Sequence, residues 1–96
     1  MIEKKDFYIN GKWVSPAKPN DFEVINPSTE EAFAIISLGS AEDADKAINA
    51  AKIAFETWRE TTKEERLALL EKFDEIYNRR WDEMVEAQSK EMGAPL

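Results

Sequence analysis

A chain of 96 residues in which 43% are apolar and 34% are charged has the composition of one soluble folded segment, not of a disordered tail. Its formal net charge of −7 argues against a nucleic-acid or anionic-membrane partner, because both require a basic face. The absence of cysteine and histidine excludes disulfides, thiolate nucleophiles, imidazole bases and the usual zinc ligands.

The first 38 residues predict two β-hairpins. Asn10-Gly11 lies between apolar strand formers, and this pair favours a tight turn because both positions tolerate positive φ, so a hairpin is expected over 6–15. An antiparallel hairpin is expected over 22–38. Its second strand, 32–38, is apolar almost throughout, so we expect it to be covered on both faces. The charged residues 1–5 are expected to be frayed.

A first helix is predicted over 40–58. Ser40 and Asp43 have the spacing of a capping box, in which each side chain accepts a hydrogen bond from the other residue's backbone amide. Apolar residues then recur every three or four positions and form one face, which ends in Phe55 and Trp58. We expect this face to be buried.

Two further helices are predicted, over 62–79 and over 81–92. The second helix begins with a capping box formed by Thr62 and Glu65. The third helix is expected to end at Gly93, because glycine adopts the left-handed conformation of a C-cap without strain. The predicted fold class is therefore α+β, with two short β-hairpins and three helices.

No active site is apparent from the residues alone. The acidic clusters lie on predicted helices, where solvated surface and compensation of the helix dipole explain them. The three glycines are isolated, so no phosphate-binding loop is present. We also find no secretory signal and no run of about 20 apolar residues, and we therefore expect a cytoplasmic protein without a membrane partner.

Five segments together carry a specific resemblance, whereas each alone is a weak signal. They are YINGKWV at 8–14, VINPSTEE at 24–31, SAEDADKA with AAKIAFETW at 40–58, EERLALLEKF at 64–73 and KEMGAPL at 90–96. In order and spacing they resemble the amino-terminal segment of the NAD(P)-dependent aldehyde dehydrogenase superfamily. The resemblance covers residues 7–96.

The resemblance implies that the chain is part of an α/β, Rossmann-like cofactor domain. It implies an oxidoreductase that oxidises an aldehyde with NAD or NADP through a cysteine thiohemiacetal, and that assembles as a homo-oligomer, a dimer or a tetramer. The family's catalytic and most of its cofactor-binding residues lie beyond position 96. We therefore assign no catalytic and no cofactor-binding residue here, and expect the 96-residue chain alone to be inactive.

One site is implied within the chain by the same resemblance. Several family members hold a structural monovalent cation, Na or K, between main-chain carbonyls beside the Asn-Pro turn and a carboxylate just before the late glycine. The matching positions are Val24, Ile25 and Glu91. The alternative for these residues is an ordinary turn and a glutamate at a helix end.

A second interpretation of the whole chain stays open on the sequence. The residues could encode a free-standing acidic α+β interaction module without enzymatic activity. The polypeptide beyond Leu96 discriminates between the two interpretations: a continuing chain with a glycine-rich turn and a lone reactive cysteine decides for the enzyme.

Overall fold

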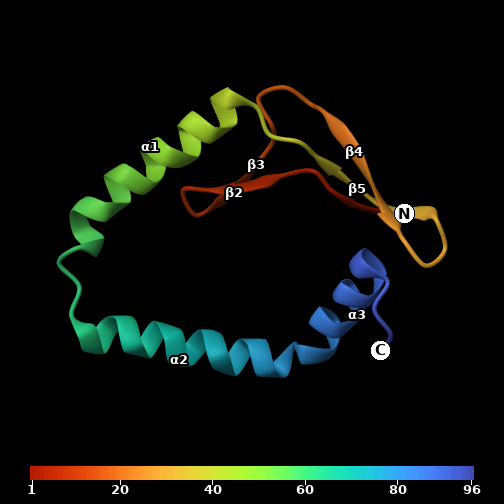
Figure 1. Cartoon of the computed structure of the whole chain (residues 1–96). Helices are drawn as coiled ribbons and strands as arrows, with labels where there is room; N and C mark the ends of the chain where they lie inside the picture. Colours follow the sequence, from red (N-terminus) through yellow and green to blue (C-terminus); the bar gives the residue numbers. More distant parts are fainter.

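The computed structural model describes all 96 residues as five short strands and three helices (Figure 1). The elements are β1 (Ile2–Lys4), β2 (Phe7–Ile9), β3 (Lys12–Val14), β4 (Asp21–Asn26), β5 (Glu31–Ser37), α1 (Ala41–Trp58), α2 (Lys63–Arg79) and α3 (Trp81–Met92). The strands form a three-stranded sheet in the order β1-β5-β4 and a separate β2-β3 hairpin. This arrangement is the expected α+β fold with three helices and small sheets.

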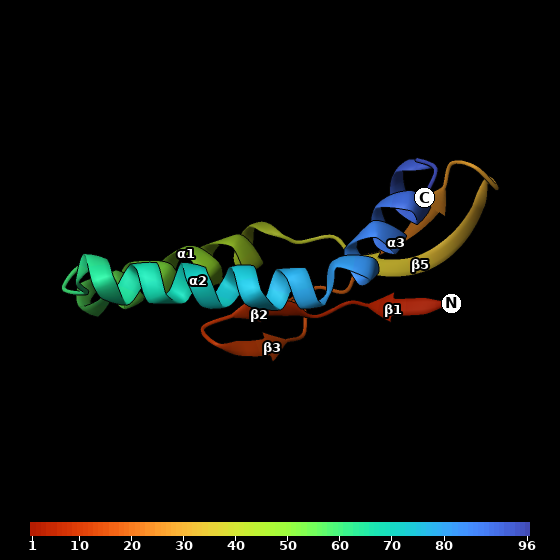
Figure 2. The same cartoon turned by 90° about the horizontal axis from the view of Figure 1, so that it is seen from below.

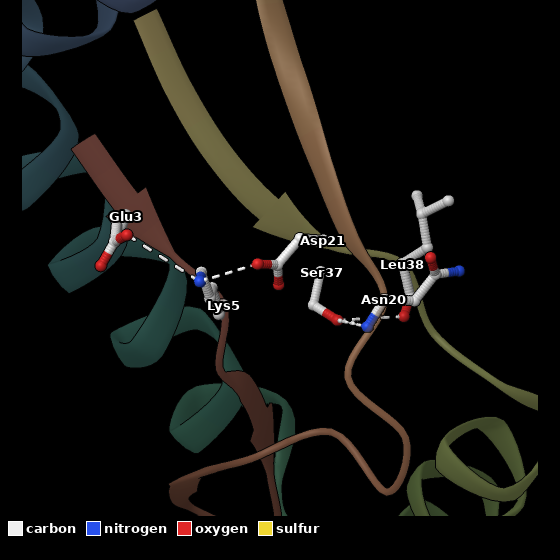
Figure 3. Close-up of polar contacts among 6 residues, drawn as sticks. All are labelled: Glu3, Lys5, Asn20, Asp21, Ser37 and Leu38. Atoms are coloured by element: carbon white, nitrogen blue, oxygen red, sulfur yellow. Dashed lines mark hydrogen bonds and ion pairs between the residues drawn. The ribbon is translucent and has the colours of Figure 1, made fainter. Parts of the chain in front are cut away.

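The expectation that residues 1–5 are frayed is wrong. β1 pairs in parallel with β5, with Ile2 opposite Ala34 and Lys4 opposite Ile36. Lys5 Nζ lies 2.9 Å from Asp21 Oδ2 on β4 and 3.8 Å from Glu3 Oε1 (Figure 3). The free edge of β5 supplies backbone partners to a short charged strand, and the ion pair with Asp21 holds the end of that strand in place.

β5 is the central strand of the sheet, and its residues are half-buried or buried on both faces from Ala32 onward. It pairs antiparallel with β4, and the register shifts between Val24 and Ile25, where β5 carries one extra residue as a β-bulge. Ser37, which is buried, accepts a hydrogen bond from the Asn20 backbone amide, and Asn20 in turn accepts one from Leu38 (Figure 3). These bonds close the end of the hairpin beside α1.

The start of α1 is fixed by a carboxylate that reaches beyond its own helix. Asp43 and Ser40 form the capping box, with Asp43 Oδ2 accepting from the Ser40 amide at 3.0 Å. The other oxygen, Asp43 Oδ1, accepts from the Ala17 amide at 2.9 Å, 26 residues earlier in the chain. Only 6% of Asp43 is exposed, so one buried carboxylate ties the loop after β3 to the first turn of α1.

The stability of this junction is expected to depend on acid pH. Backbone hydrogen bonds from Ser40 and then from Ala17 lower the pKa of Asp43 below 3.8. A lowered pKa in the folded state means that the stabilisation is complete above the unfolded-state value of 3.8 and is lost as the pH falls through the folded value. Denaturant midpoints of the Asp43→Asn variant should therefore change less over that window than wild-type midpoints. Asp45→Asn removes an equal charge from the same helix and should retain the wild-type slope.

α2 and α3 are nearly continuous along the chain. α2 begins with the capping box of Thr62 and Glu65, and α3 ends at Gly93 with φ +72°. Aromatic contacts stiffen the junction between the helices. The Tyr77 ring stacks on Phe73 with centroids 6.2 Å apart and meets Trp81 edge-on at 5.6 Å. None of the three helices combines the length and the apolar composition needed to cross a bilayer.

The molecule is open and flat, with α1 along one side and α2 along the other (Figures 1 and 2). The Cα radius of gyration is 17.1 Å, whereas a compact chain of this length has about 12.5 Å. The expected burial of the apolar face of α1 is therefore wrong for this chain, since Phe55 and Trp58 are 57% and 46% exposed. The β2-β3 hairpin lies against the alanines of this face but leaves its aromatic end open to solvent.

Candidate functional site

The strongest candidate site is a groove of about 450 Å³ between α3 and the three-stranded sheet. We call it the α3 groove. Val24 of β4 and Glu91 of α3, which the resemblance placed in a candidate cation site, both line it, whereas Ile25, the third residue of that site, does not. Its apolar floor comes from all three strands and from α3, and consists of Ile2, Val24, Phe33, Ala34, Ile36 and Ala87.

The C-terminal end of α3 is held at the groove by a close backbone contact. A Cβ atom at Gly93 would lie 3.0 Å from Pro27 Cγ and 3.0 Å from Ser28 Oγ, so only a glycine fits there without movement. Ser28 Oγ donates a hydrogen bond to the Gly93 carbonyl at 3.4 Å, and Asn26 Oδ1 accepts from the Ser28 amide at 2.9 Å. The turn between β4 and β5 and the last turn of α3 therefore form one unit.

Charged side chains border the groove with alternating sign. Lys90 Nζ lies 2.9 Å from Glu86 Oε1, which is one turn away on α3. Arg80 donates two hydrogen bonds to Glu83, at 2.8 and 3.0 Å, and this pair lowers the pKa of Glu83. Glu91 has no ion pair, so its carboxylate is available to a cation.

The backbone beside Val24 and Ile25 differs from regular strand. The β-bulge lies on β5, opposite these two residues, and a bulge disrupts the ladder of hydrogen bonds locally. Oxygen ligands from main-chain carbonyls and a carboxylate suit a hard cation. The donors on the groove thus fit a cation in their chemistry, although no cluster of three acidic, histidine or cysteine side chains is present to hold one.

The chain carries no glycine-rich turn of the kind that binds the pyrophosphate of a nicotinamide cofactor. Gly11, Gly39 and Gly93 are far apart in the sequence, so no glycine-rich turn opens a helix, and cysteine is absent. The chain's buried carboxylate, Asp43, is fully engaged in holding the Ala17 loop and the N-cap. We therefore assign no catalytic step to any residue of this chain.

A comparison with protein families decides the broader identity. The model of the aldehyde dehydrogenase family matches residues 13–96. The chain belongs to the aldehyde dehydrogenase family. A solved aldehyde dehydrogenase from Bartonella henselae superposes on 99% of the chain with a TM-score of 0.98 and 59% sequence identity.

Curated relatives support the same family assignment. The chain is 45% identical over 96 residues to 3-succinoylsemialdehyde-pyridine dehydrogenase from Pseudomonas sp, and 45% identical over 89 residues to a putative aldehyde dehydrogenase from Staphylococcus aureus. It spans 20% and 19% of the length of these two relatives, and 20% of the Bartonella henselae chain. The chain is therefore a segment about one fifth as long as these aldehyde dehydrogenases.

Sequence reasoning missed the contact that shapes the α3 groove. The local patterns predict Gly93 as a helix cap and residues 26–29 as a turn, but neither pattern indicates that the two meet across 65 positions.

Proposed function

We propose that this chain is the amino-terminal, non-catalytic part of an enzyme that oxidises an aldehyde to a carboxylic acid with NAD or NADP. The observation that supports the proposal is the match over 99% of the chain to a solved aldehyde dehydrogenase at 59% identity. The complete enzyme would be a homo-oligomer, as the resemblance implies, and we expect it in the cytoplasm. Its cysteine nucleophile would come from outside these residues, and the nicotinamide would accept the hydride.

Within that enzyme, the chain's own residues would act as scaffold. The exposed apolar faces of α1 and α2 offer large side chains, including Phe55, Leu70 and Phe73, for packing against the rest of the protein. The capping boxes fix where α1 and α2 begin, and Asp43 ties the loop after β3 to the first turn of α1. None of these roles requires a reactive side chain, which agrees with the composition.

A chimera tests the proposal. The chain would replace the matching fifth of the Bartonella henselae aldehyde dehydrogenase, and aldehyde-dependent reduction of NAD and NADP would be measured by absorbance. We expect an active chimera, no activity from the 96-residue chain, and no activity from the relative after deletion of its matching segment. A chimera that is soluble and assembled as the parent enzyme is, but has no activity, would contradict the proposal and favour the free-standing module.

We also propose that the α3 groove holds a structural monovalent cation, Na or K, between the carbonyls of Val24 and Ile25 and the carboxylate of Glu91. Support comes from the placement of Val24 and Glu91 on one groove and from the β-bulge of β5 opposite Val24 and Ile25. The ion would join β4 to the end of α3 and would take no part in the chemistry.

Cation-dependent stability tests this second proposal. The active chimera should melt at a higher temperature in KCl or NaCl than in choline chloride of equal ionic strength, since a tenfold excess of ion over Kd stabilises by about 1.4 kcal/mol. Glu91→Gln should abolish the difference. Asp82→Asn removes the same charge from α3 outside the groove and should preserve it. Equal melting of wild type in all three salts would refute the site.

A further inference from the structure

The turn of the β2-β3 hairpin places the side-chain amide of Asn10 beside the backbone amide of Gly11, and neither group is hydrogen-bonded. Asn10 and Gly11 both have positive φ, of 54° and 74°, as a two-residue type I′ turn requires. Both residues are exposed, and a Cβ at Gly11 would meet no atom within 4 Å. The side-chain amide of Asn10 makes no hydrogen bond, and the Gly11 amide donates none to the backbone.

We propose that Asn10 is a site of spontaneous deamidation. The backbone nitrogen of Gly11 attacks Cγ of Asn10, loses its proton to solvent, and displaces the side-chain nitrogen as ammonia to form a cyclic succinimide. Water then opens the ring at either carbonyl, which yields aspartate or isoaspartate at position 10. No oxidant, reductant or enzyme is needed, and glycine suits the attack because it has no Cβ to hinder the nitrogen.

The hairpin protects this turn only weakly. β2 and β3 form three residue pairs, from Phe7 opposite Val14 to Ile9 opposite Lys12, and no third strand joins them. A two-stranded hairpin is marginally stable in water, so local opening lets Asn10 reach the geometry of attack.

The other four asparagines each lack one requirement. Asn26 is followed by Pro27, whose nitrogen carries no hydrogen, and its side chain already accepts from Ser28. Asn78 lies in α2 and donates to the Asp74 carbonyl at 2.9 Å. Asn49 lies inside α1. Asn20 is followed by Asp21, which has a Cβ that shields the attacking backbone nitrogen and which is paired with Ser37 in the sheet. Asn10 therefore stands apart on local chemistry and on structure.

The modification would alter the contact between the hairpin and α1. Residues 8–11 and the alanines of α1 line a hollow of about 480 Å³; the alanines are Ala47, Ala50, Ala51 and Ala54. Deamidation adds a negative charge beside this apolar wall, and an isoaspartate also lengthens the turn backbone by one carbon. Both changes disfavour the pairing of Tyr8 with Trp13 and the packing of the hairpin against α1.

Peptide mapping of the aged 96-residue chain tests the proposal directly. Cleavage after lysine separates Asn10 in peptide 6–12 from Asn49 in 47–52 and Asn78 in 73–90. Asn20 and Asn26 remain together in 13–46, because the bond between Lys18 and Pro19 resists cleavage. During incubation at mildly alkaline pH, peptide 6–12 should gain about 1 Da and split into two chromatographic forms. It should do so about tenfold faster than any other peptide, because only Gly11 offers an unhindered nitrogen. Equal or faster reaction at another asparagine would overturn the proposal.

Two comparisons separate the role of the turn from that of the sequence. A synthetic peptide of residues 6–12 gives the rate without structure, and the folded chain should react at no less than about a tenth of it, since the hairpin opens readily. A slower rate would overturn the proposal. Gly11→Ala is compared in the synthetic peptide, where no folded turn is strained, and should slow the reaction there because the added Cβ hinders the nitrogen. An unchanged rate in that peptide would exclude attack by the residue-11 nitrogen.

Discussion

The 96-residue chain in isolation is expected to self-associate or to unfold in part, and not to behave as a monomer with one cooperative transition. It exposes 8116 Å², about 2,500 Å² more than a compact globule of its mass. Only three residues are buried, and Ala34 is the sole apolar one among them. Each large apolar side chain left in water forfeits roughly 1.5–3 kcal/mol, and a typical domain is stable by only about 5–15 kcal/mol.

Sedimentation velocity at micromolar concentration, combined with binding of a hydrophobic dye, tests this expectation. Leu70 and Phe73, which are 66% and 67% exposed on α2, should carry much of the association. The double variant Leu70→Gln, Phe73→Gln should therefore sediment closer to a monomer and bind less dye. Leu96→Gln changes a still more exposed apolar residue outside the helices and should have little effect. A monodisperse wild-type monomer that unfolds cooperatively would show that these faces need no cover.

The elements that the sequence predicted well are those determined by neighbouring residues. Ser40 and Thr62 specify where α1 and α2 begin because each bonds a residue three positions ahead. Asn10 and Gly11 specify the first turn because positive φ is a local property. Such signals act over one turn of chain, so they survive even though the surrounding fold is open.

The features that the sequence could not predict depend on distant partners. The charged residues of β1 carry no strand pattern, and only the free edge of β5 and the Lys5–Asp21 pair order them. Periodicity correctly marked an apolar face on α1, but it cannot say whether another element covers the whole face, and here Phe55 and Trp58 stay exposed. The candidate cation site shows the same limit. Val24 and Glu91 were linked only through a family resemblance, because no local pattern joins positions 67 apart.

Gly93→Ala is expected to detach the end of α3 from the β4-β5 turn. The residue has φ +72°, which costs an alanine roughly 1–2 kcal/mol. The new methyl group would also lie 3.0 Å from Pro27 Cγ and from Ser28 Oγ, closer than carbon and oxygen atoms normally approach. We expect a total local destabilisation of about 2–3 kcal/mol, read as faster hydrogen exchange of the last amides of α3 and of Ser28.

Gly11→Ala is the matched control, because Gly11 has a similar φ of +74° but open space around its Cβ. It should show the backbone strain alone, and should accelerate exchange only in the β2-β3 hairpin. The additional destabilisation by Gly93→Ala, beyond that by Gly11→Ala, then measures the contact with Pro27 and Ser28. Adding Ser28→Ala should recover part of that excess, since the clashing oxygen is removed, although the hydrogen bond to the Gly93 carbonyl is lost as well. If Gly93→Ala and Gly11→Ala destabilise their surroundings equally, α3 does not pack against the β4-β5 turn. The claim that this turn and the last turn of α3 form one unit would then be wrong.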